Sequence, residues 1–202
     1  MKSSFKSDLQ QEKRLTKLLD SYYKKYLVQY SFKRISSYKE QLQGIDLVLI
    51  HKGSQVEYFV DEKAQLDYIN ESLPTFALEL FYEKNSVHKQ GWLFDQRKKT
   101  QFYSLVTSIY SDEENVFTSC NITFVNRSKL IEHLNLLGLT SENLQNTIKE
   151  NQEVHGKLIL EQLHPRKEGY LFFSTQNKAE KPVNLILKLD YLIEIGVGKK
   201  FI

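Results

Sequence analysis

Two aspartates and a lysine stand close together on neighbouring segments of strand-like composition. Asp46 follows Gly44 and opens an apolar run to Ile50, and Asp61 and Lys63 lie near the end of the next such segment, 56–64. Side chains alternate faces along a strand, so Asp61 and Lys63 share one face. A turn at 51–54 predicts a hairpin over 44–64, which would bring Asp46 beside them.

Two carboxylates and one ammonium group at one point suit phosphodiester hydrolysis. Hard cations such as Mg²⁺ take carboxylate oxygens and keep several waters. The bound cation polarises a phosphoryl oxygen and acidifies a water molecule. A neighbouring lysine such as Lys63 can orient or deprotonate the attacking water, or offset the charge on phosphorus. The pattern therefore predicts a metal-dependent site that uses Mg²⁺ or Mn²⁺.

The acid-x-Lys triplet has a plainer interpretation when it is considered alone. A chain with 25 acidic residues is expected to contain about three such triplets by chance. Asp61 and Lys63 could be an ordinary surface pair, and Asp46 could be a turn residue after glycine. The apolar strand before the triplet, and the Gly-x-Asp on the preceding strand, favour the active-site interpretation.

Two further carboxylates are candidates for the same site. Glu12 lies at the edge of an apolar stripe in a helix predicted over 8–30, where a carboxylate needs a partner. Glu79 lies in the middle of the apolar segment 75–82. It is a candidate either for a further metal ligand or for the partner of a lysine.

Candidate substrate-binding residues follow the acid-x-Lys triplet and a later basic run. Gln65 shares the predicted face of Lys63, so it either touches a phosphate or caps the strand end. Lys98, Lys99 and Thr100 follow Arg97 and are of the types that contact phosphates. A solvated loop explains this basic run nearly as well.

The charge distribution is uneven although the net charge is only +3. Residues 1–40 carry ten Lys and Arg against four Asp and Glu, 41–83 carry two against eight, and 84–100 carry five against one. An acidic segment between two basic ones fits an acidic metal site flanked by phosphate-binding lysines. Ordinary solvated surface charge is the alternative.

Composition narrows the class of protein. The 202 residues are 41% hydrophobic and include one cysteine, Cys120. We expect one domain over 1–202, a reducing cytoplasmic setting, and neither a membrane span nor a signal peptide. The five histidines show no zinc-ligand spacing, and the sequence has no glycine-rich phosphate loop.

The pattern of elements predicts a mixed α/β fold in which an N-terminal helix leads into a central sheet. The segments 75–82 and 121–126 are predicted strands, 91–94 a short strand or turn, and 101–109 a strand or buried helix start. Ser128 is expected to cap a helix over 129–137 and Thr140 to cap a second. Further strands are expected near 156–162, 169–174 and 183–189.

With these residues, the sequence resembles the PD-(D/E)xK nuclease superfamily, the restriction-endonuclease-like fold. The resemblance covers roughly 8–110, and the segments GID, VDEKA, TFALEL and GWLFD look like those of small uncharacterised prokaryotic and phage members. In that family a helix acid, a strand Asp and an acid-x-Lys on the adjacent strand form the site. Glu12, Asp46, Asp61 and Lys63 match these positions, and Ile45 stands where many members have proline.

The resemblance implies a restriction-endonuclease-like core over 1–110, with a central mixed β-sheet flanked by helices, and a C-terminal α+β extension over 111–202. It implies a nuclease acting on nucleic acid, most simply DNA, with Asp46, Asp61 and the main-chain carbonyl of Glu62 as metal ligands. Many members work as dimers, so a homodimer is one expected state. The alternative is a non-catalytic nucleic-acid-binding or accessory interaction protein that retains the fold.

Overall fold

The computed structural model describes residues 5–84, 87–113, 116–176 and 180–202. As predicted for its class, the chain is mixed α/β, and its strands form two sheets. It divides into two compact units. The first comprises Met1–Leu73, Thr100–Phe124 and Lys200–Ile202, and the second comprises Pro74–Lys99 and Val125–Lys199. A single domain over 1–202 stays a prediction, and its expected core boundary after residue 110 falls inside a strand, Phe102–Glu113.

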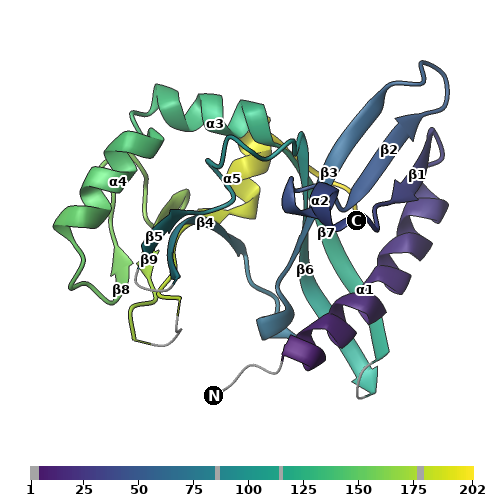
Figure 1. Ribbon diagram of the computed structural model, residues 1–202, viewed down its shortest axis with the longest axis horizontal. Helices are drawn as coiled ribbons and strands as arrows, with labels where there is room; N and C mark the ends of the chain where they lie inside the picture. Colours follow the sequence, from purple (N-terminus) through teal and green to yellow (C-terminus); the bar gives the residue numbers. More distant parts are fainter. Residues whose placement is uncertain (1–4, 85–86, 114–115, 177–179) are drawn as a thin grey trace. The chain divides into compact units, whose positions relative to one another are not determined.

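The first unit holds the N-terminal helix and most of a six-stranded sheet (Figure 1). Its elements are α1 (Phe5–Tyr26), β1 (Tyr30–Arg34), α2 (Tyr38–Leu42), β2 (Leu47–His51), β3 (Glu57–Ala64), η1 (Leu66–Tyr68), β6 (Phe102–Glu113) and β7 (Val116–Asn126). The sheet order is β1-β2-β3-β6-β7-β11, where β11 is Gly198–Lys200. Strands β1, β2 and β3 are antiparallel neighbours, whereas β3 and β6 run parallel.

The predicted hairpin of 44–64 is confirmed, and its register determines where the acidic residues lie. Leu47 pairs with Val60, and the pairing continues outward to Ile50 and Glu57. Both Leu47 and Val60 are completely buried. Because a shift by one residue would turn these two side chains out of the core, burial holds this register.

Helix α1 packs on the sheet through one apolar stripe. Leu15, Leu19 and Tyr23 recur at intervals of four and are at most 3% exposed, in a core cluster that includes Leu47 and Val60. This spacing places all three side chains on the same helical face. The face of α1 that packs on the sheet is therefore fixed, and the adjoining side chains, including Glu12, are held at the edge of this contact.

The helix predicted over 8–30 is too long at its end. It stops at Tyr26, and Tyr30–Arg34 forms β1, an edge strand that pairs with β2. The alternating burial of β1 shows the period of two that is typical of a strand, with Tyr30, Phe32 and Arg34 as its less exposed residues. Pairing with β2 therefore outweighs the helical spacing of the tyrosines.

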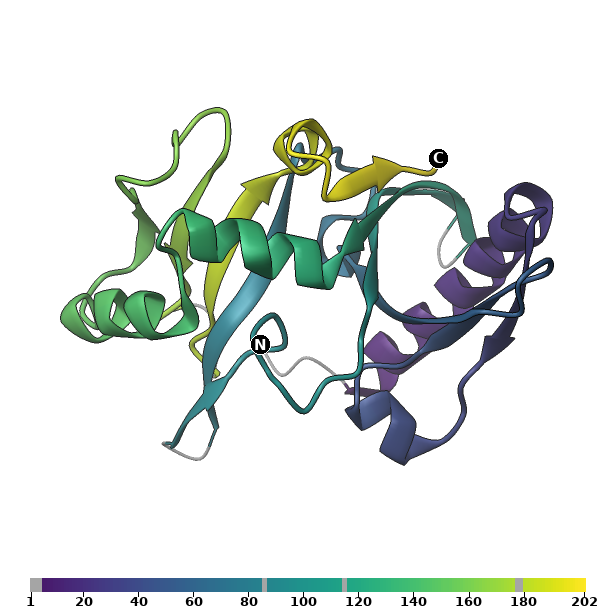
Figure 2. The same ribbon diagram turned by 90° about the horizontal axis from the view of Figure 1, so that it is seen from above.

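The second unit holds a five-stranded sheet in the order β5-β4-β10-β9-β8 (Figure 2). Its elements are β4 (Thr75–Lys84), β5 (Val87–Gln90), α3 (Arg127–Leu136), α4 (Ser141–Glu150), β8 (Gly156–Leu158), β9 (Gly169–Phe173), β10 (Val183–Lys188) and α5 (Leu189–Glu194). The predicted strand at 75–82 therefore lies in a different sheet from β2 and β3. One central sheet was too simple a prediction, because β4 pairs with β10 from much later in the chain.

Two further local predictions can be compared with the structure. Segment 101–109 is a strand, and 91–94 contains a turn rather than a strand. The cap of α3 was wrongly assigned to Ser128, since Asn126 accepts the hydrogen bond from the Lys129 amide. Thr140 caps α4 as predicted. Among the described residues, none of the helices combines the length and the apolar character needed to cross a bilayer.

The α1 contact can be tested by removing one of its core side chains. Leu19 is 2% exposed, so we expect Leu19→Ala to lower the free energy of unfolding by about 2–5 kcal/mol. Leu136→Ala is the control, since Leu136 is 81% exposed and its loss should cost under about 0.5 kcal/mol. Urea unfolding measures both. An equal effect of the two substitutions would contradict the packing described for α1.

Candidate active site in the first unit

Asp46 lies at the start of the hairpin and reaches across to β3. Its amide donates to the Val60 carbonyl at 3.0 Å, and its Oδ2 accepts a hydrogen bond from the Glu62 amide at 2.9 Å. These two contacts lie on either side of Asp61 in the sequence of β3. Main-chain pairing therefore holds the Asp46 carboxyl group next to residue 61, as the predicted hairpin required.

Asp61 is an almost fully buried carboxylate. Its exposed fraction is 2%, and its Oδ1 lies 2.6 Å from the Nζ of Lys63. The other carboxylate oxygen, Oδ2, is buried and has no hydrogen-bond partner among the described residues. A buried carboxylate oxygen without a partner is costly. The structure thus brings Asp46, Asp61 and Lys63 together and leaves one acceptor unsatisfied.

The two carboxyl groups disfavour each other's charge. Burial, followed by the negative charge of Asp61, raises the pKa of Asp46 to about 7, although the Glu62 amide and the Lys63 ammonium act in the opposite direction. Near neutral pH, the pair therefore holds a proton for part of the time. A cation could replace that proton and satisfy the free oxygen of Asp61.

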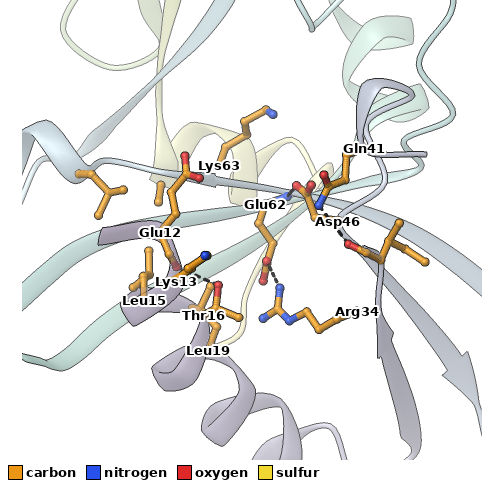
Figure 3. A pocket seen from close by; sticks show the side chains of 13 residues that line it. Glu12, Lys13, Leu15, Thr16, Leu19, Arg34, Gln41, Asp46, Glu62 and Lys63 are labelled. Carbon is orange, nitrogen blue, oxygen red and sulfur yellow. Dashed lines mark hydrogen bonds and ion pairs between the residues drawn. The ribbon is translucent and has the colours of Figure 1, made fainter. Parts of the chain in front are cut away.

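A pocket of about 540 Å³ is lined by Asp46 and Lys63, while Asp61 lies behind its wall (Figure 3). Its wall comes from α1, β1, α2 and β3, and its polar lining residues are Glu12, Lys13, Thr16, Arg34, Gln41, Asp46, Glu62 and Lys63. Glu12, on α1, and Lys63, on β3, both line this pocket, although the two residues are far apart in the sequence. The volume lies within the range of small-molecule sites in proteins.

A half-buried polar network in the wall of the pocket was not predicted from the sequence. Glu62 accepts a hydrogen bond from the Tyr23 hydroxyl at 2.7 Å and forms an ion pair with Arg34. Arg34 also pairs with Asp20, and the Tyr23 hydroxyl lies 3.0 Å from that of Ser104. Figure 3 shows Glu62 and Lys63 projecting in opposite directions from β3. The two side chains point in opposite directions because neighbouring residues of a strand alternate between its faces.

The network links β3 to α1 and β1 through Glu62, the residue whose main-chain amide donates a hydrogen bond to Asp46. Burial and the charge of Glu62 raise the pKa of Tyr23 well above its usual range, so the phenol stays protonated and can donate. The Glu62 side chain therefore helps to position β3 against α1 and β1, and it points away from Lys63. No local sequence pattern predicts this network, because its members come from four separate parts of the sequence.

The other candidates in the first unit have different surroundings. Glu12 is exposed and lines the pocket. Gln65 follows the last residue of β3 and is half-buried, and its main-chain amide donates to the Val106 carbonyl. Thr100 is 5% exposed, and its hydroxyl donates to the Gly44 carbonyl at 2.8 Å. This contact gives Thr100 a structural role in holding the turn before Asp46, which differs from the predicted phosphate contact.

The remaining candidates belong to the second unit. Lys98 and Lys99 follow a turn in which Asp95 pairs with Arg97. Glu79 lies in β4, where it is opposite Asn184 of β10. None of these residues is part of the pocket lining. Their roles as phosphate contacts and as a further metal ligand stay predictions.

The donor set suits a cation that needs few protein ligands. Within the described residues, no group of three or more His, Cys, Asp or Glu side chains has the arrangement of a metal cluster. Mg²⁺ usually keeps several waters and binds through one or two carboxylates together with substrate phosphates. Asp46 and Asp61, with the unsatisfied Oδ2 of Asp61, fit that mode of binding.

Comparisons with known proteins do not assign a family to this chain. No family model, curated protein or solved structure matches it. The function of the pocket therefore has to be inferred from the chemistry of its own residues.

The raised pKa of Asp46, which is caused first by burial and then by the charge of Asp61, makes a prediction about stability. The pKa of Asp46 in the folded protein, about 7, exceeds the usual value for an unfolded chain, about 3.9. Stability from this group is thus present below about pH 4 and is lost as the pH rises through 7. In the presence of chelator, the Tm of Asp46→Asn minus the Tm of the wild type should therefore increase by several degrees from pH 5 to pH 8, because about 1 kcal/mol shifts the Tm by about 2–4 °C.

Glu57→Gln is the control for this experiment, because Glu57 is an exposed carboxylate on the same strand, β3. Differential scanning fluorimetry would give the Tm of each variant minus that of the wild type at each pH. An Asp46→Asn difference that does not change with pH would contradict the raised pKa of Asp46.

Proposed function

We propose that this protein is a metal-dependent nuclease that hydrolyses phosphodiester bonds, with DNA as the substrate. The main support is the convergence of Asp46, Asp61 and Lys63 beside an open pocket, with one buried oxygen of Asp61 left unsatisfied. A surface ion pair explains neither the burial of Asp61 nor the raised pKa of Asp46.

Asp46 and Asp61 would hold the cation, with the Glu62 main-chain carbonyl as a proposed third ligand. Bound Mg²⁺ or Mn²⁺ supplies Lewis acidity, which polarises the phosphoryl oxygen and lowers the pKa of a water molecule. Hydrolysis forms a bond between the water oxygen and phosphorus, breaks one P–O ester bond, and transfers a proton to the leaving oxygen.

Lys63 is the proposed catalytic cation of the protein itself. Its ammonium group is held 2.6 Å from Asp61 Oδ1, and the residue lines the pocket that a phosphate must enter. A donor held in place offsets charge that builds up on the phosphoryl oxygens and orients a water molecule at no further cost of reorganisation. Glu12 lines the same space from α1 and is proposed as a second carboxylate acting on the attacking water.

The arrangement of the elements supports a restriction-endonuclease-like core for the first unit. Helix α1, carrying Glu12, is followed in the chain by the antiparallel strands β1, β2 and β3. Asp46 directly precedes β2, and Asp61 and Lys63 lie on the adjacent β3. This is the order of helix acid, strand aspartate and acid-x-Lys that the sequence resembles.

Cation binding can be measured by thermal stabilisation in Mg²⁺ or Mn²⁺. A ligand that binds only the folded state stabilises it by about 2.7 kcal/mol at 100 times its Kd. We expect a rise in Tm with the wild type, and its loss in Asp61→Asn. Glu57→Gln should keep the full rise. An unchanged rise in Asp61→Asn would place the cation elsewhere.

Hydrolysis is tested by incubating the purified protein with linear, circular and single-stranded DNA in Mg²⁺, Mn²⁺ or chelator. We expect metal-dependent cleavage, and a fall of about 10²–10⁴-fold in the rate of Lys63→Ala. Lys52→Ala, an exposed lysine in the turn of the same hairpin, should keep the wild-type rate. Cleavage that survives in chelator or in Lys63→Ala would contradict the proposed function.

A further inference from the structure

The side of helix α1 that faces away from the sheet carries a row of lysines. Lys17 lies two residues from both Leu15 and Leu19, whose side chains are buried in the core, so it points to the opposite side of the helix. Lys13 precedes Lys17 by four residues and Lys24 follows it by seven, which places all three on one side of the helix. All three lysines are exposed. They are called here the basic face of α1.

The acidic residues near the basic face do not neutralise it. Among the residues that the structure describes, none of its three lysines forms an ion pair. Asp20 neighbours the face on the helix, but its carboxylate pairs with Arg34 at 2.7 Å. Glu12 lines the pocket. Lys13 and Lys17 are like charges four residues apart, a spacing that destabilises a helix. The fold therefore gains nothing from this row of charge, whereas binding of an anionic partner would.

The basic face meets the candidate active site at one end. Lys13 lines the same pocket as Asp46 and Lys63 (Figure 3). From Lys13 to Lys24 the helix rises by about 16 Å. A DNA duplex carries about ten negative charges over that length, one for each 1.7 Å or so of its axis. The row of lysines thus begins at the pocket and is long enough to contact several phosphates next to the one that the pocket holds.

The packing of α1 favours DNA over a membrane as the anionic partner. Basic amphipathic helices that bind membranes bury their apolar side among the lipids. In α1 that side is already used, because Leu15, Leu19 and Tyr23 are at most 3% exposed and belong to the core. Only the charged side of the helix is left to bind a partner. A row of exposed lysines matches the closely spaced phosphates of a nucleic acid backbone.

We propose that the basic face of α1 binds the phosphate backbone of DNA, independently of base sequence, and holds the strand at the pocket. This inference rests on the proposed nuclease function and adds the surface by which the substrate is held. Contacts between lysines and phosphates supply affinity and position but do not read the bases. They also release the counterions condensed on DNA, so the affinity falls steeply as the salt concentration rises.

The test is fluorescence anisotropy of a labelled DNA duplex in chelator, at salt concentrations from about 50 to 200 mM. The double variant Lys17→Gln/Lys24→Gln is compared with the wild type. Each lost contact should lower the slope of log affinity against log salt by about 0.9, so we expect a fall of about 1.8 and a loss of affinity of at least about 10-fold. Lys17→Arg/Lys24→Arg keeps the charge and should keep the slope. Because glutamine and lysine have similar helix propensities, the Tm should not fall.

Lys129→Gln/Lys149→Gln is the matched control, because both residues are exposed lysines on helices, α3 and α4, and the change in net charge is the same. This variant should bind the duplex with the slope and the affinity of the wild type. In the cleavage assay, Lys17→Gln/Lys24→Gln should raise KM and leave kcat within about threefold, as expected for residues that bind the substrate without acting on the reacting phosphate.

Three results would overturn this inference. They are an unchanged salt slope in Lys17→Gln/Lys24→Gln, an equal loss in the control variant, or binding of phosphatidylserine vesicles instead of DNA through the same two lysines. These results are separate from the fate of the nuclease proposal. Metal-dependent cleavage with an unchanged salt slope would leave a nuclease and refute the basic face as its DNA-binding surface. DNA binding that depends on the two lysines, without any cleavage, would refute the nuclease and support the surface.

Discussion

The proximity of two aspartates, one buried and one half-buried, is the constraint on which the candidate site depends. Pairing of β2 with β3 places Asp46 beside Asp61. Burial removes the hydration of Asp61 and part of the hydration of Asp46. One ammonium group, from Lys63, offsets part of this charge. A proton or a bound cation must offset the remaining negative charge, which links the electrostatics of the folded chain to ligand binding.

The surrounding structure keeps this unfavourable pair in place. The apolar stripe of α1 sets the position of Tyr23, whose hydroxyl, together with Arg34, holds the Glu62 side chain. The amide of Glu62 in turn holds Asp46. Groups with their own hydrogen bonds and ion pairs therefore surround a carboxylate oxygen that has none. Such an arrangement is typical of a site organised for a ligand rather than for stability.

The sequence predicted the elements that rest on local periodicity. The hairpin, the alternation that puts Asp61 and Lys63 on one face, and the Thr140 cap follow from spacing or from residue type over a few positions. The end of α1 could not be predicted, because Tyr30–Arg34 adopts strand geometry through its pairing with β2. The assignment of 75–82 to a second sheet depends on β10, about 100 residues away.

Long-range contacts also explain what was missed at the candidate site. The network joins four elements through Tyr23, Arg34, Glu62 and Ser104. The spacing of Tyr23 predicts that it is buried but does not predict its polar partners. Thr100 has the residue type of a phosphate contact, but its hydroxyl is bound to the Gly44 carbonyl in the interior. The type of a side chain predicts which chemistry it could do, whereas its partners in the fold decide whether it is available.

The most direct measurement is calorimetric titration of Mn²⁺ into the protein in buffers of different ionisation enthalpy. If the cation replaces the proton that Asp46 and Asp61 hold, about one proton should be released per bound cation at pH 6, falling toward none at pH 8. Asp61→Asn should abolish the binding. Absence of Mn²⁺ binding, or binding without proton release at pH 6, would contradict the assignment of this carboxylate pair as a metal site.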